Sequence, residues 1–371
     1  MRRWLALVLL VPLLSAPSPR PKTEFAKLIE RLSEPGGYFA SDNLVSNETS
    51  YLHVLGAFRA LGIRGGAYLG VGPEQGFSYI AETEPELAVV VDIRRDNMLL
   101  HLLIKTMFAA SRNRLEYLCL LYGRPAPAEL AMWTDLPLGS LLDYIDGHPM
   151  DSTLHRKNHQ ALARKVASLG LALGDEDKAT LQRFHDEFAE SGLGIRYSTR
   201  NRWSRRAFPT NRQLYAETDL EGKEGSYLAT EDRWRVIKRM HAEDRIVPVV
   251  GDVAGPKAMA AIGGYLSEKG LALSVFYLSN VESYLFRQGS FPAFVANVRQ
   301  LPTSDHSMIV RSWFGRGWAL PSSVSGHFST QLLQPMSRFL ELTANPDSVD
   351  YWALVNDAID LRDPLAALVP R

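Results

Sequence analysis

The chain has 371 residues, of which 46% are hydrophobic and 22% charged, so it can bury a sizeable core and is too apolar for a disordered protein. Its 41 basic residues balance 41 acidic ones, which excludes an overall electrostatic field that would attract nucleic acid or an anionic membrane. Cys119 is the single cysteine, which excludes an internal disulfide framework and a cysteine-based metal site. We therefore expect a small-molecule ligand and no specific nucleic acid.

The first 21 residues have the layout of a secretory signal peptide, in which basic residues precede a short apolar run and small residues follow it. The apolar run, residues 4–14, is about half the length that a transmembrane helix needs, so we expect no stable membrane span. Pro17 follows the small residues directly and leaves the cleavage point open. We expect residues 1–21 to direct export to the periplasm or the medium, or to tether the protein loosely to a membrane. A cytoplasmic tail is the alternative.

Two helices are predicted ahead of the first strand. Apolar residues recur at helical spacing over residues 23–32 and 49–61, and glycine follows each segment. The stretch between these helices is polar, and its notable side chains are Tyr38, Asp42, Asn43 and Asn47.

Five short apolar runs bounded by turn residues predict strands. The first four runs are continuous rather than alternating, as expected for strands that helices cover on both faces of a parallel sheet. Helical segments at 74–81 and 256–269 separate neighbouring strands, so strand and helix alternate. The pattern predicts an α/β protein with a doubly wound, mostly parallel, Rossmann-like sheet. The predicted strands are residues 67–71, 87–91, 246–250, 273–278 and 308–314.

A long polar segment interrupts this alternation. Residues 124–229 are mostly helical in pattern, and we expect this insertion to form a lid on the core. The two halves of the α/β core are then residues 22–123 and 230–330, and the first half contains a helix at 97–108 that is apolar nearly all round and should be buried. Residues 331–371 carry apolar side chains at helical spacing and are expected to form a C-terminal helical cap.

Glycine and polar residues follow the first four predicted strands, at the edge where ligands bind in a doubly wound sheet. Gly70 and Gly72 end the first strand and permit a tight turn with close approach of the backbone to a ligand. Asp92 ends the second strand, 22 positions after Gly70, a distance at which an acid can meet a ribose hydroxyl pair. The other candidate residues at this edge are Gln75, Asp252, Ser279, Asn280 and Glu282.

This series of strand ends resembles the motifs of class I S-adenosylmethionine-dependent methyltransferases. The resemblance implies that the glycine turn and Gln75 contact the methionine portion of the cofactor, that Asp92 holds the ribose and that Asp252 faces the adenine. It also implies that residues 279–282 border the reacting methyl group. The segments GAYLGVGPEQGFSYIA, VVVDIRRDN and VFYLSNVESYL resemble more closely a bacterial family without a known activity, over about residues 35–125 and 230–315.

The glycine turn departs from the methyltransferase pattern at two positions. Glu74 stands where the motif commonly has its third glycine, and Pro73 removes one backbone donor from the turn. Gly76 falls one position too late for the nicotinamide fingerprint, and Glu74 would repel a pyrophosphate. A sulfonium ligand has no phosphate and tolerates the acid better, so the pattern favours S-adenosylmethionine over a dinucleotide.

Asn280 and Glu282 are the candidate catalytic residues. Asn280 could accept a hydrogen bond from a nucleophile, and Glu282, if desolvated beside the cofactor, could act as a general base. Tyr284 could stack on a substrate, although a tyrosine at helical spacing from Glu282 is more often part of a core.

Arginines provide candidate sites for an anionic substrate. Arg94 and Arg95 could clamp a carboxylate or the ribose phosphate of NADP, or form a solvated pair at the end of the strand. Arg202 and Arg205 belong to residues 196–212, which contain six arginines and no acid. Such a run is an anion or nucleic-acid contact in some proteins and a solvated loop in most.

Two histidines in the insertion stand at metal-ligand spacing. His155 and His159 are four residues apart and would share a helix face. No third ligand is evident, so two surface histidines are the favoured interpretation and no metal site is predicted.

Three functions remain open at the level of the sequence. The first is methyl transfer from S-adenosylmethionine to a small or lipid-like acceptor. The second is an exported, non-catalytic binding protein that uses a degenerate methyltransferase-like cleft to hold an anionic ligand, because a secreted enzyme would meet no supply of that cofactor. The third and weakest is an NADP-type reductase, supported by Arg94 and Arg95 alone.

Overall fold

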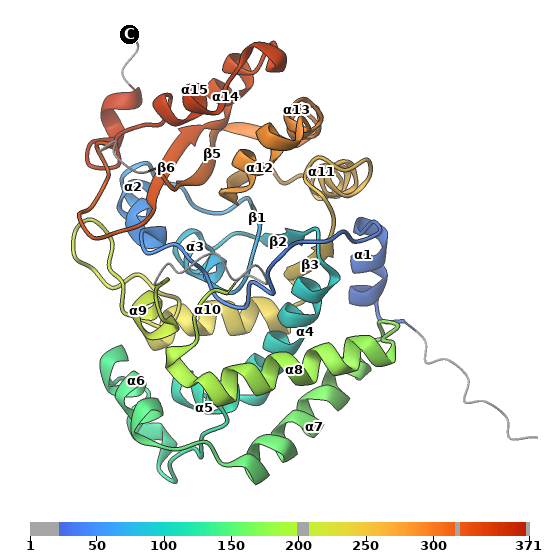
Figure 1. Ribbon diagram of the computed structural model, residues 1–371, viewed down its shortest axis with the longest axis vertical. Helices are drawn as coiled ribbons and strands as arrows, with labels where there is room; N and C mark the ends of the chain where they lie inside the picture. The colour runs from blue at the N-terminus through green and yellow to red at the C-terminus, as the bar shows by residue number, and fades with distance from the viewer. Residues whose placement is uncertain (1–21, 199–207, 316–319, 369–371) are drawn as a thin grey trace, which may run out of the picture.

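The computed structural model describes residues 22–198, 208–315 and 320–368 and has a six-stranded mixed sheet at its centre (Figure 1). The strand order is β3-β2-β1-β4-β5-β6, and every neighbouring pair is parallel except β5 and β6, which are antiparallel. Chain order therefore runs outward in both directions from the junction of β1 and β4. The strands are β1 (Ala67–Gly70), β2 (Leu87–Asp92), β3 (Ile246–Val250), β4 (Leu273–Ser279), β5 (Thr303–Trp313) and β6 (Thr330–Pro335).

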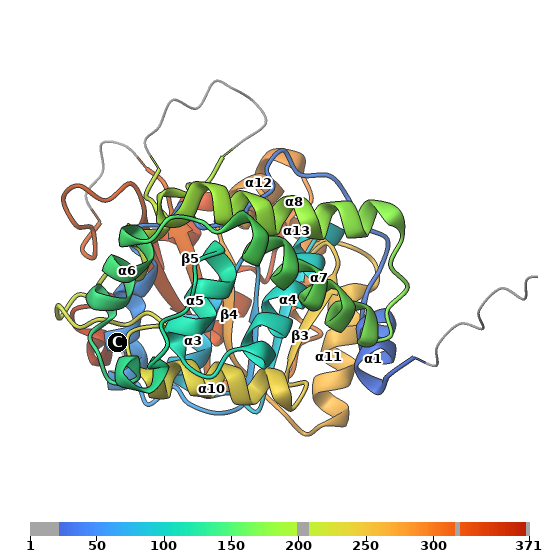
Figure 2. The ribbon, with the colours of Figure 1, turned by 90° about the horizontal axis from the view of Figure 1, so that it is seen from below.

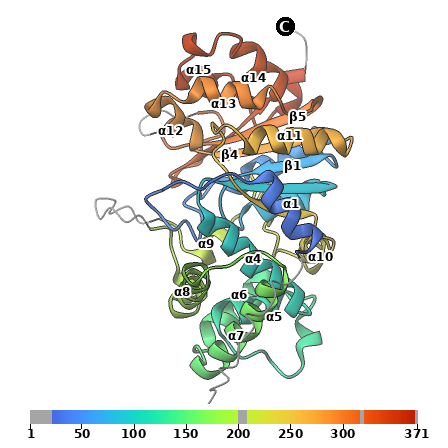
Figure 3. The ribbon, with the colours of Figure 1, turned by 90° about the vertical axis from the view of Figure 1, so that its right-hand side faces the viewer.

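Helices cover both faces of this sheet, as the continuous apolar strands predicted. In Figure 3 the strands lie between α11–α15 on one side and α4–α10 on the other. The α-helices are α1 (Glu24–Leu32), α2 (Leu55–Ala60), α3 (Gly76–Thr83), α4 (Arg95–Ala110), α5 (Arg114–Tyr122), α6 (Leu138–Gly147), α7 (Ser152–Ser168), α8 (Asp175–Ser191), α9 (Asn211–Tyr215), α10 (Glu231–Ala242), α11 (Ala258–Glu268), α12 (Val281–Gln288), α13 (Phe291–Val298), α14 (Met336–Leu342) and α15 (Tyr351–Asn356). The 3₁₀ turns are η1 (Tyr51–Val54), η2 (Leu130–Trp133), η3 (Gly192–Gly194), η4 (Pro346–Ser348) and η5 (Pro364–Leu368).

The insertion packs onto α4 and α5 rather than onto the sheet. Helix α4 touches β2 and β3 on one side and α7 and α8 on the other, so nearly all of its side chains are buried, as its apolar pattern predicted. Figure 2 shows α8 and α7 lying over α4 and α5. Residues 124–229 are mostly helical where the structure describes them.

The prediction of an entirely helical C-terminal segment is wrong for residues 330–335. These residues form β6, which pairs with β5. The side chains of Gln331, Leu333 and Gln334 are fully buried in this strand. The apolar residues Leu332 and Met336 fit a helical period as well as a strand, and six residues are too few to separate the two periods. The open edge of β5 decides the outcome, because it supplies hydrogen-bond partners for the backbone of β6.

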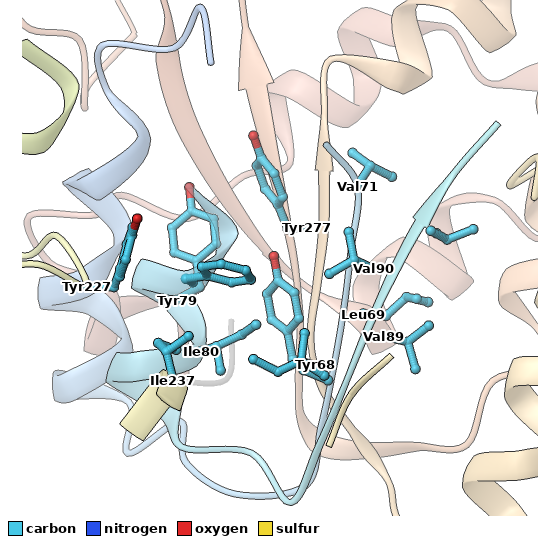
Figure 4. Close-up of a cluster of buried hydrophobic side chains, with 14 of the residues drawn as sticks. Tyr68, Leu69, Val71, Tyr79, Ile80, Val89, Val90, Tyr227, Ile237 and Tyr277 are labelled. Atoms are coloured by element: carbon cyan, nitrogen blue, oxygen red, sulfur yellow. The ribbon is translucent and has the colours of Figure 1, made fainter. Parts of the chain in front are cut away.

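Tyrosine rings fill the space beneath the glycine turn (Figure 4). Tyr68 and Gly70 lie on the same face of β1, and a Cβ atom at Gly70 or Gly76 would overlap the Tyr68 ring. The ring of Tyr79 lies 5.0 Å from that of Tyr277 on β4 and 6.5 Å from that of Tyr68. These glycines are therefore required by packing below the turn as well as by the turn itself.

None of the helices in the described residues is long and apolar enough to cross a membrane.

Two adjacent glycines in α11 test the packing of this helix. A Cβ atom at Gly263 would lie 2.5 Å from the carbonyl oxygen of Gln300, whereas one at Gly264 would meet nothing within 4 Å. We expect Gly263→Ala to lower the free energy of unfolding by about 1–3 kcal/mol, because the backbone of the loop must move. Gly264→Ala should raise it by about 0.5–1 kcal/mol. Urea unfolding of both variants measures the difference, and equal effects would contradict this packing.

Candidate functional site

A cavity of about 170 Å³ opens at the carboxyl ends of β1, β2, β3 and β4, where the strand order reverses. This is the edge at which ligands bind in open α/β sheets. Its walls combine apolar and aromatic side chains with polar and charged ones in similar number, and the polar groups could orient a small molecule. The residues that line it include Tyr38, Phe39, Asn43, Ser46, Asn47, Glu48, Val71, Gly72, Gln75, Asp92, Arg94, Tyr197, Asp252, Ser279, Asn280, Val281, Tyr284 and Gln288.

The segment between α1 and η1 crosses the strand ends and forms one wall of the cavity. The backbone N–H of Glu34 donates to the carbonyl of Val250 (2.9 Å), and that of Gly37 donates to the carbonyl of Ile93 (2.7 Å). Beyond these contacts, Tyr38 reaches the mouth of the cavity with 72% of its surface exposed. The polar stretch identified in the sequence is therefore part of the site.

The glycine turn forms the floor of the cavity. Gly72 has a φ of +88°, a conformation that favours glycine, and its carbonyl accepts a hydrogen bond from His101 Nε2 (3.0 Å). Gln75 Nε2 donates to the hydroxyl of Tyr277 (3.2 Å), whereas the buried Oε1 of Gln75 has no partner among the described residues. A buried acceptor without a partner is uncommon. The turn thus offers one unused acceptor to a ligand.

Asp92 lies at the cavity wall but is already paired. Its carboxylate accepts hydrogen bonds from Arg94 Nε (3.0 Å), Arg94 Nη2 (2.7 Å) and the Arg94 backbone N–H (2.9 Å). Arg94 Nη1 donates to the carbonyl of Ser41 (2.9 Å), so the guanidinium is held on both sides. Arg94 therefore fixes the end of β2 and the covering segment, and it is not free to clamp an external anion.

Arg95, the neighbour of Arg94, does not line the cavity. Arg95 forms an ion pair with Asp177 of α8 (2.8 Å from Nε to Oδ1) and donates to the carbonyl of Ala172 (3.0 Å), so it joins the insertion to the core. Arg202 and Arg205 lie outside the described residues.

Asp252 lies at the cavity in a loop that Glu34 holds in place. The Glu34 carboxylate accepts hydrogen bonds from the backbone N–H groups of Asp252 (2.8 Å), Lys257 (2.8 Å) and Ala258 (3.1 Å). Asp252 Oδ1 in turn accepts from the backbone N–H of Ala254 (2.9 Å). The structure therefore brings Gly72, Gln75, Asp92 and Asp252 around one cavity.

The two predicted catalytic residues separate in space. Asn280 lines the cavity, whereas Glu282 does not. Helix α12 turns Val281, Tyr284 and Gln288 toward the cavity, and Glu282, one residue on from Val281, faces the other way. There its carboxylate pairs with Arg311 Nε (2.6 Å), and both side chains are buried. Glu282 is thus half of an internal ion pair.

Glu48 is a third carboxyl group at the cavity, beside those of Asp92 and Asp252, and no sequence pattern points to it. It is 1% exposed and accepts hydrogen bonds from Tyr277 (2.7 Å), Ser312 (2.5 Å) and Ser279. Ser279 has a φ of +53°, which is rare for a residue other than glycine and holds its hydroxyl toward Glu48. Burial raises the pKa of Glu48, and the three hydroxyl donors only partly oppose this effect.

The hydroxyl group of Ser312 contacts two acceptor atoms, and one of them belongs to Glu48. Ser312 Oγ lies 2.5 Å from Glu48 Oε2 and 2.8 Å from Gln331 Oε1, and both of these atoms accept hydrogen bonds. A hydroxyl group has one proton and can donate to one of them. Ser312 therefore donates to Glu48 when the carboxyl group is ionised, and it accepts from Glu48 and donates to Gln331 when the carboxyl group carries a proton. Both protonation states of Glu48 thus have a hydrogen-bond partner at Ser312.

Glu74 of the glycine turn points away from the cavity. Its carboxylate accepts hydrogen bonds from Tyr117 (2.9 Å), Tyr227 (2.8 Å) and Tyr215. Tyr215 and Tyr227 belong to the insertion, so this acid ties the insertion to the turn. Burial raises the pKa of Glu74. The expectation that Glu74 would repel a phosphate in the cavity does not hold for this geometry.

The histidines of the insertion are buried, and the interpretation as surface residues is wrong. His155 and His159 are each 6% exposed and pack with His185 of α8, which is fully buried. His155 Nε2 lies 2.7 Å from Asp186 Oδ1, and His159 Nδ1 lies 3.2 Å from His185 Nδ1. These contacts join α7 to α8.

The fold and the cavity together define an α/β protein with a cavity across the carboxyl ends of its central strands. A family model described as a domain of unknown function, DUF7790, matches residues 44–129 and 172–360. The chain belongs to this family. The two matched segments contain Glu48, Gly72, Asp92, Asp252 and Asn280, so most of the cavity lies within them. A search of curated proteins finds no match.

The Glu282–Arg311 pair should contribute to stability and not to ligand binding. We expect Glu282→Gln to lower the free energy of unfolding by about 3–5 kcal/mol, because it leaves the buried Arg311 guanidinium without its counter-charge. Adding Arg311→Met should recover part of this loss, since the double variant buries no unpaired charge. Urea unfolding of the single and double variants tests the prediction, and a loss below about 1 kcal/mol in the single variant would contradict it.

The raised pKa values of Glu48 and Glu74 predict a specific pH dependence. The folded state keeps these protons to higher pH than the unfolded state, so each group makes a stabilising contribution that is lost as pH rises above about 4.3. Relative to the wild type, Glu48→Gln and Glu74→Gln should therefore gain stability as pH increases. Glu341→Gln, at an exposed position, serves as the control for the replacement of glutamate by glutamine. Thermal unfolding at several pH values measures the trend, and differences that are independent of pH would contradict it.

Proposed function

We propose that the cavity binds S-adenosylmethionine and that the protein transfers its methyl group to a small acceptor. The observation that carries this proposal is the convergence of the glycine turn, Asp92, Asp252 and Asn280 around one cavity. These are the strand ends through which the sequence resembles class I methyltransferases. An antiparallel strand beside β5, at the edge of an otherwise parallel sheet, is compatible with a Rossmann-like fold of that type.

The residues of the floor fit the methionine portion of such a ligand. Gln75 Oε1 is a buried acceptor without a partner, and an ammonium group would satisfy it. A Cβ atom at Gly72 would lie 3.5 Å from Gln75 Nε2 and 3.8 Å from Asn43 Nδ2, so it would have room at this position. A side chain at Gly72 would fill this space, so glycine keeps it for the ligand.

Glu48 is the group that we propose to hold the acceptor proton, in place of Glu282. The cofactor, when bound, supplies an electrophilic methyl group on a sulfonium centre. The acceptor must lose a proton as it is methylated, and the ionised form of the Glu48 carboxyl group, whose proton affinity is raised by burial, can take it. Hydrogen bonds from Tyr277, Ser279 and Ser312 hold the carboxyl in a fixed orientation.

A non-catalytic binding protein is the second candidate, and the Asp92–Arg94 pair favours it. Three of the roughly four acceptor positions of the Asp92 carboxylate are used by Arg94, which leaves little capacity for a ribose hydroxyl pair. Residues 1–21, read as an export leader, support the same role. A mature N-terminus near residues 17–22 would favour the binding protein. The reductase is not proposed, because Arg94 and Arg95 both pair with carboxylates.

Calorimetric titration of the purified protein with S-adenosylmethionine and S-adenosylhomocysteine tests the first proposal. We expect binding that stabilises the fold by about 2.7 kcal/mol at a ligand concentration of a hundred times the dissociation constant. Tyr38→Ala at the cavity mouth and Asp252→Asn at its wall should weaken binding without unfolding the protein. Met132→Ala is a control at an exposed apolar position outside the cavity and should bind as the wild type does. The absence of binding by the wild type would reject the methyltransferase and leave the binding protein.

A further inference from the structure

Two histidines and a glutamate from three distant segments meet at a second place in the molecule, away from the cavity. His53 lies in η1, Glu217 follows α9, and His327 lies in the loop before β6. Each offers one nitrogen or oxygen atom, and these three atoms lie within 4.8 Å of one another. More than 100 residues separate each member from the next along the chain, so the grouping results from the tertiary fold.

The histidines of this group have unused hydrogen-bonding atoms. His53 is 3% exposed, and its buried Nδ1 has no partner within the described ranges. The Nδ1 atom of His327 is also buried without such a partner. Glu217 Oε1 accepts from the backbone N–H of Thr218 (3.0 Å), and its Oε2 lies 3.4 Å from His327 Nε2. Buried polar atoms are rarely left unsatisfied, so the site is incomplete as an internal hydrogen-bond network.

We propose that His53, Glu217 and His327 bind a divalent transition-metal ion of the zinc type. Two imidazoles and one carboxylate are a known ligand set for zinc with a fourth position open to water. The nitrogen ligands disfavour magnesium and calcium, which prefer oxygen. The proposal is independent of the function of the cavity.

The placement of the side chains suits such an ion. Ligand atoms around tetrahedral zinc lie about 3.3 Å apart, given bonds of about 2.0–2.2 Å. The three atoms must therefore draw together slightly. Glu217 and His327 are only half-buried, so their side chains have room to turn.

A metal ion here would reinforce an existing junction. The hydroxyl of Ser50 lies 2.7 Å from that of Ser329, so the loop that carries His327 already contacts the chain just ahead of η1. Glu48 lies two residues before Ser50. The ion would thus fix the segment that delivers Glu48 to the cavity against the loop that leads into β6.

Zinc titration of the purified full-length protein, in competition with a chromophoric chelator at neutral pH, tests this proposal. We expect one zinc ion per chain and no competition from magnesium. His327→Ala and Glu217→Gln change half-buried positions and should each weaken zinc binding by at least about 10-fold. His53→Gln should do the same. His306→Ala removes an exposed histidine at the start of β5 and should leave zinc binding unchanged.

Circular dichroism of each variant shows whether the fold is kept, so that lost binding can be assigned to the lost ligand. Failure of the wild type to bind zinc would overturn the proposal. Zinc binding that survives in folded His327→Ala and Glu217→Gln would also overturn it, and loss of that binding in His185→Ala would then assign the ion to the histidines of α7 and α8.

Discussion

The structure around the cavity depends on the burial of two carboxyl groups that have hydroxyl partners in place of cations. Glu48 lines the cavity and Glu74 belongs to the glycine turn, and each contacts three hydroxyl groups through hydrogen bonds. A buried carboxyl without partners would cost several kcal/mol, so these contacts must form together when the chain folds. Glu48 draws the covering segment onto β4 and β5, and Glu74 draws the insertion onto the turn. The wall and the floor of the cavity therefore depend on these two carboxyl groups.

The insertion is attached more firmly to the core than a mobile lid would be. Glu74 binds two tyrosines of the insertion, Arg95 pairs with Asp177, and buried histidines join α7 to α8. The family match omits residues 130–171, which contain α6 and α7, and resumes before α8. The residues of the insertion that bind Glu74 and Arg95 therefore fall within the matched segments, whereas α7, which also packs on α4, does not.

The sequence was sufficient to predict most of the sheet, because continuous apolar runs bounded by turns are a local signal. It also predicted that Asp92, Asp252 and Asn280 would lie at one edge, because the carboxyl ends of parallel strands share that edge. Glu48 escaped prediction because its partners lie 229 to 264 residues away along the chain and no local pattern reports them. Glu282 could have been placed correctly from the helical period alone, since Val281 and Tyr284 share a face that Glu282 does not. The helical period gave a wrong prediction at β6, because the spacing of Leu332 and Met336 also fits a strand.

A continuous row of hydrogen bonds runs from the edge of the sheet to the floor of the cavity. Tyr79, Gln331, Ser312, Glu48, Tyr277 and Gln75 follow one another at 2.5 to 3.2 Å. The hydroxyls of Ser312 and Tyr277 can each donate or accept, so the hydrogen bonds on either side of Glu48 can change with its proton. We therefore expect occupancy of the cavity at Gln75 and proton occupancy at Glu48 to be linked, and such a linkage is reciprocal. A ligand that engages Gln75 should then take up or release a fraction of a proton, which a calorimeter registers as a binding heat that changes with the ionisation enthalpy of the buffer.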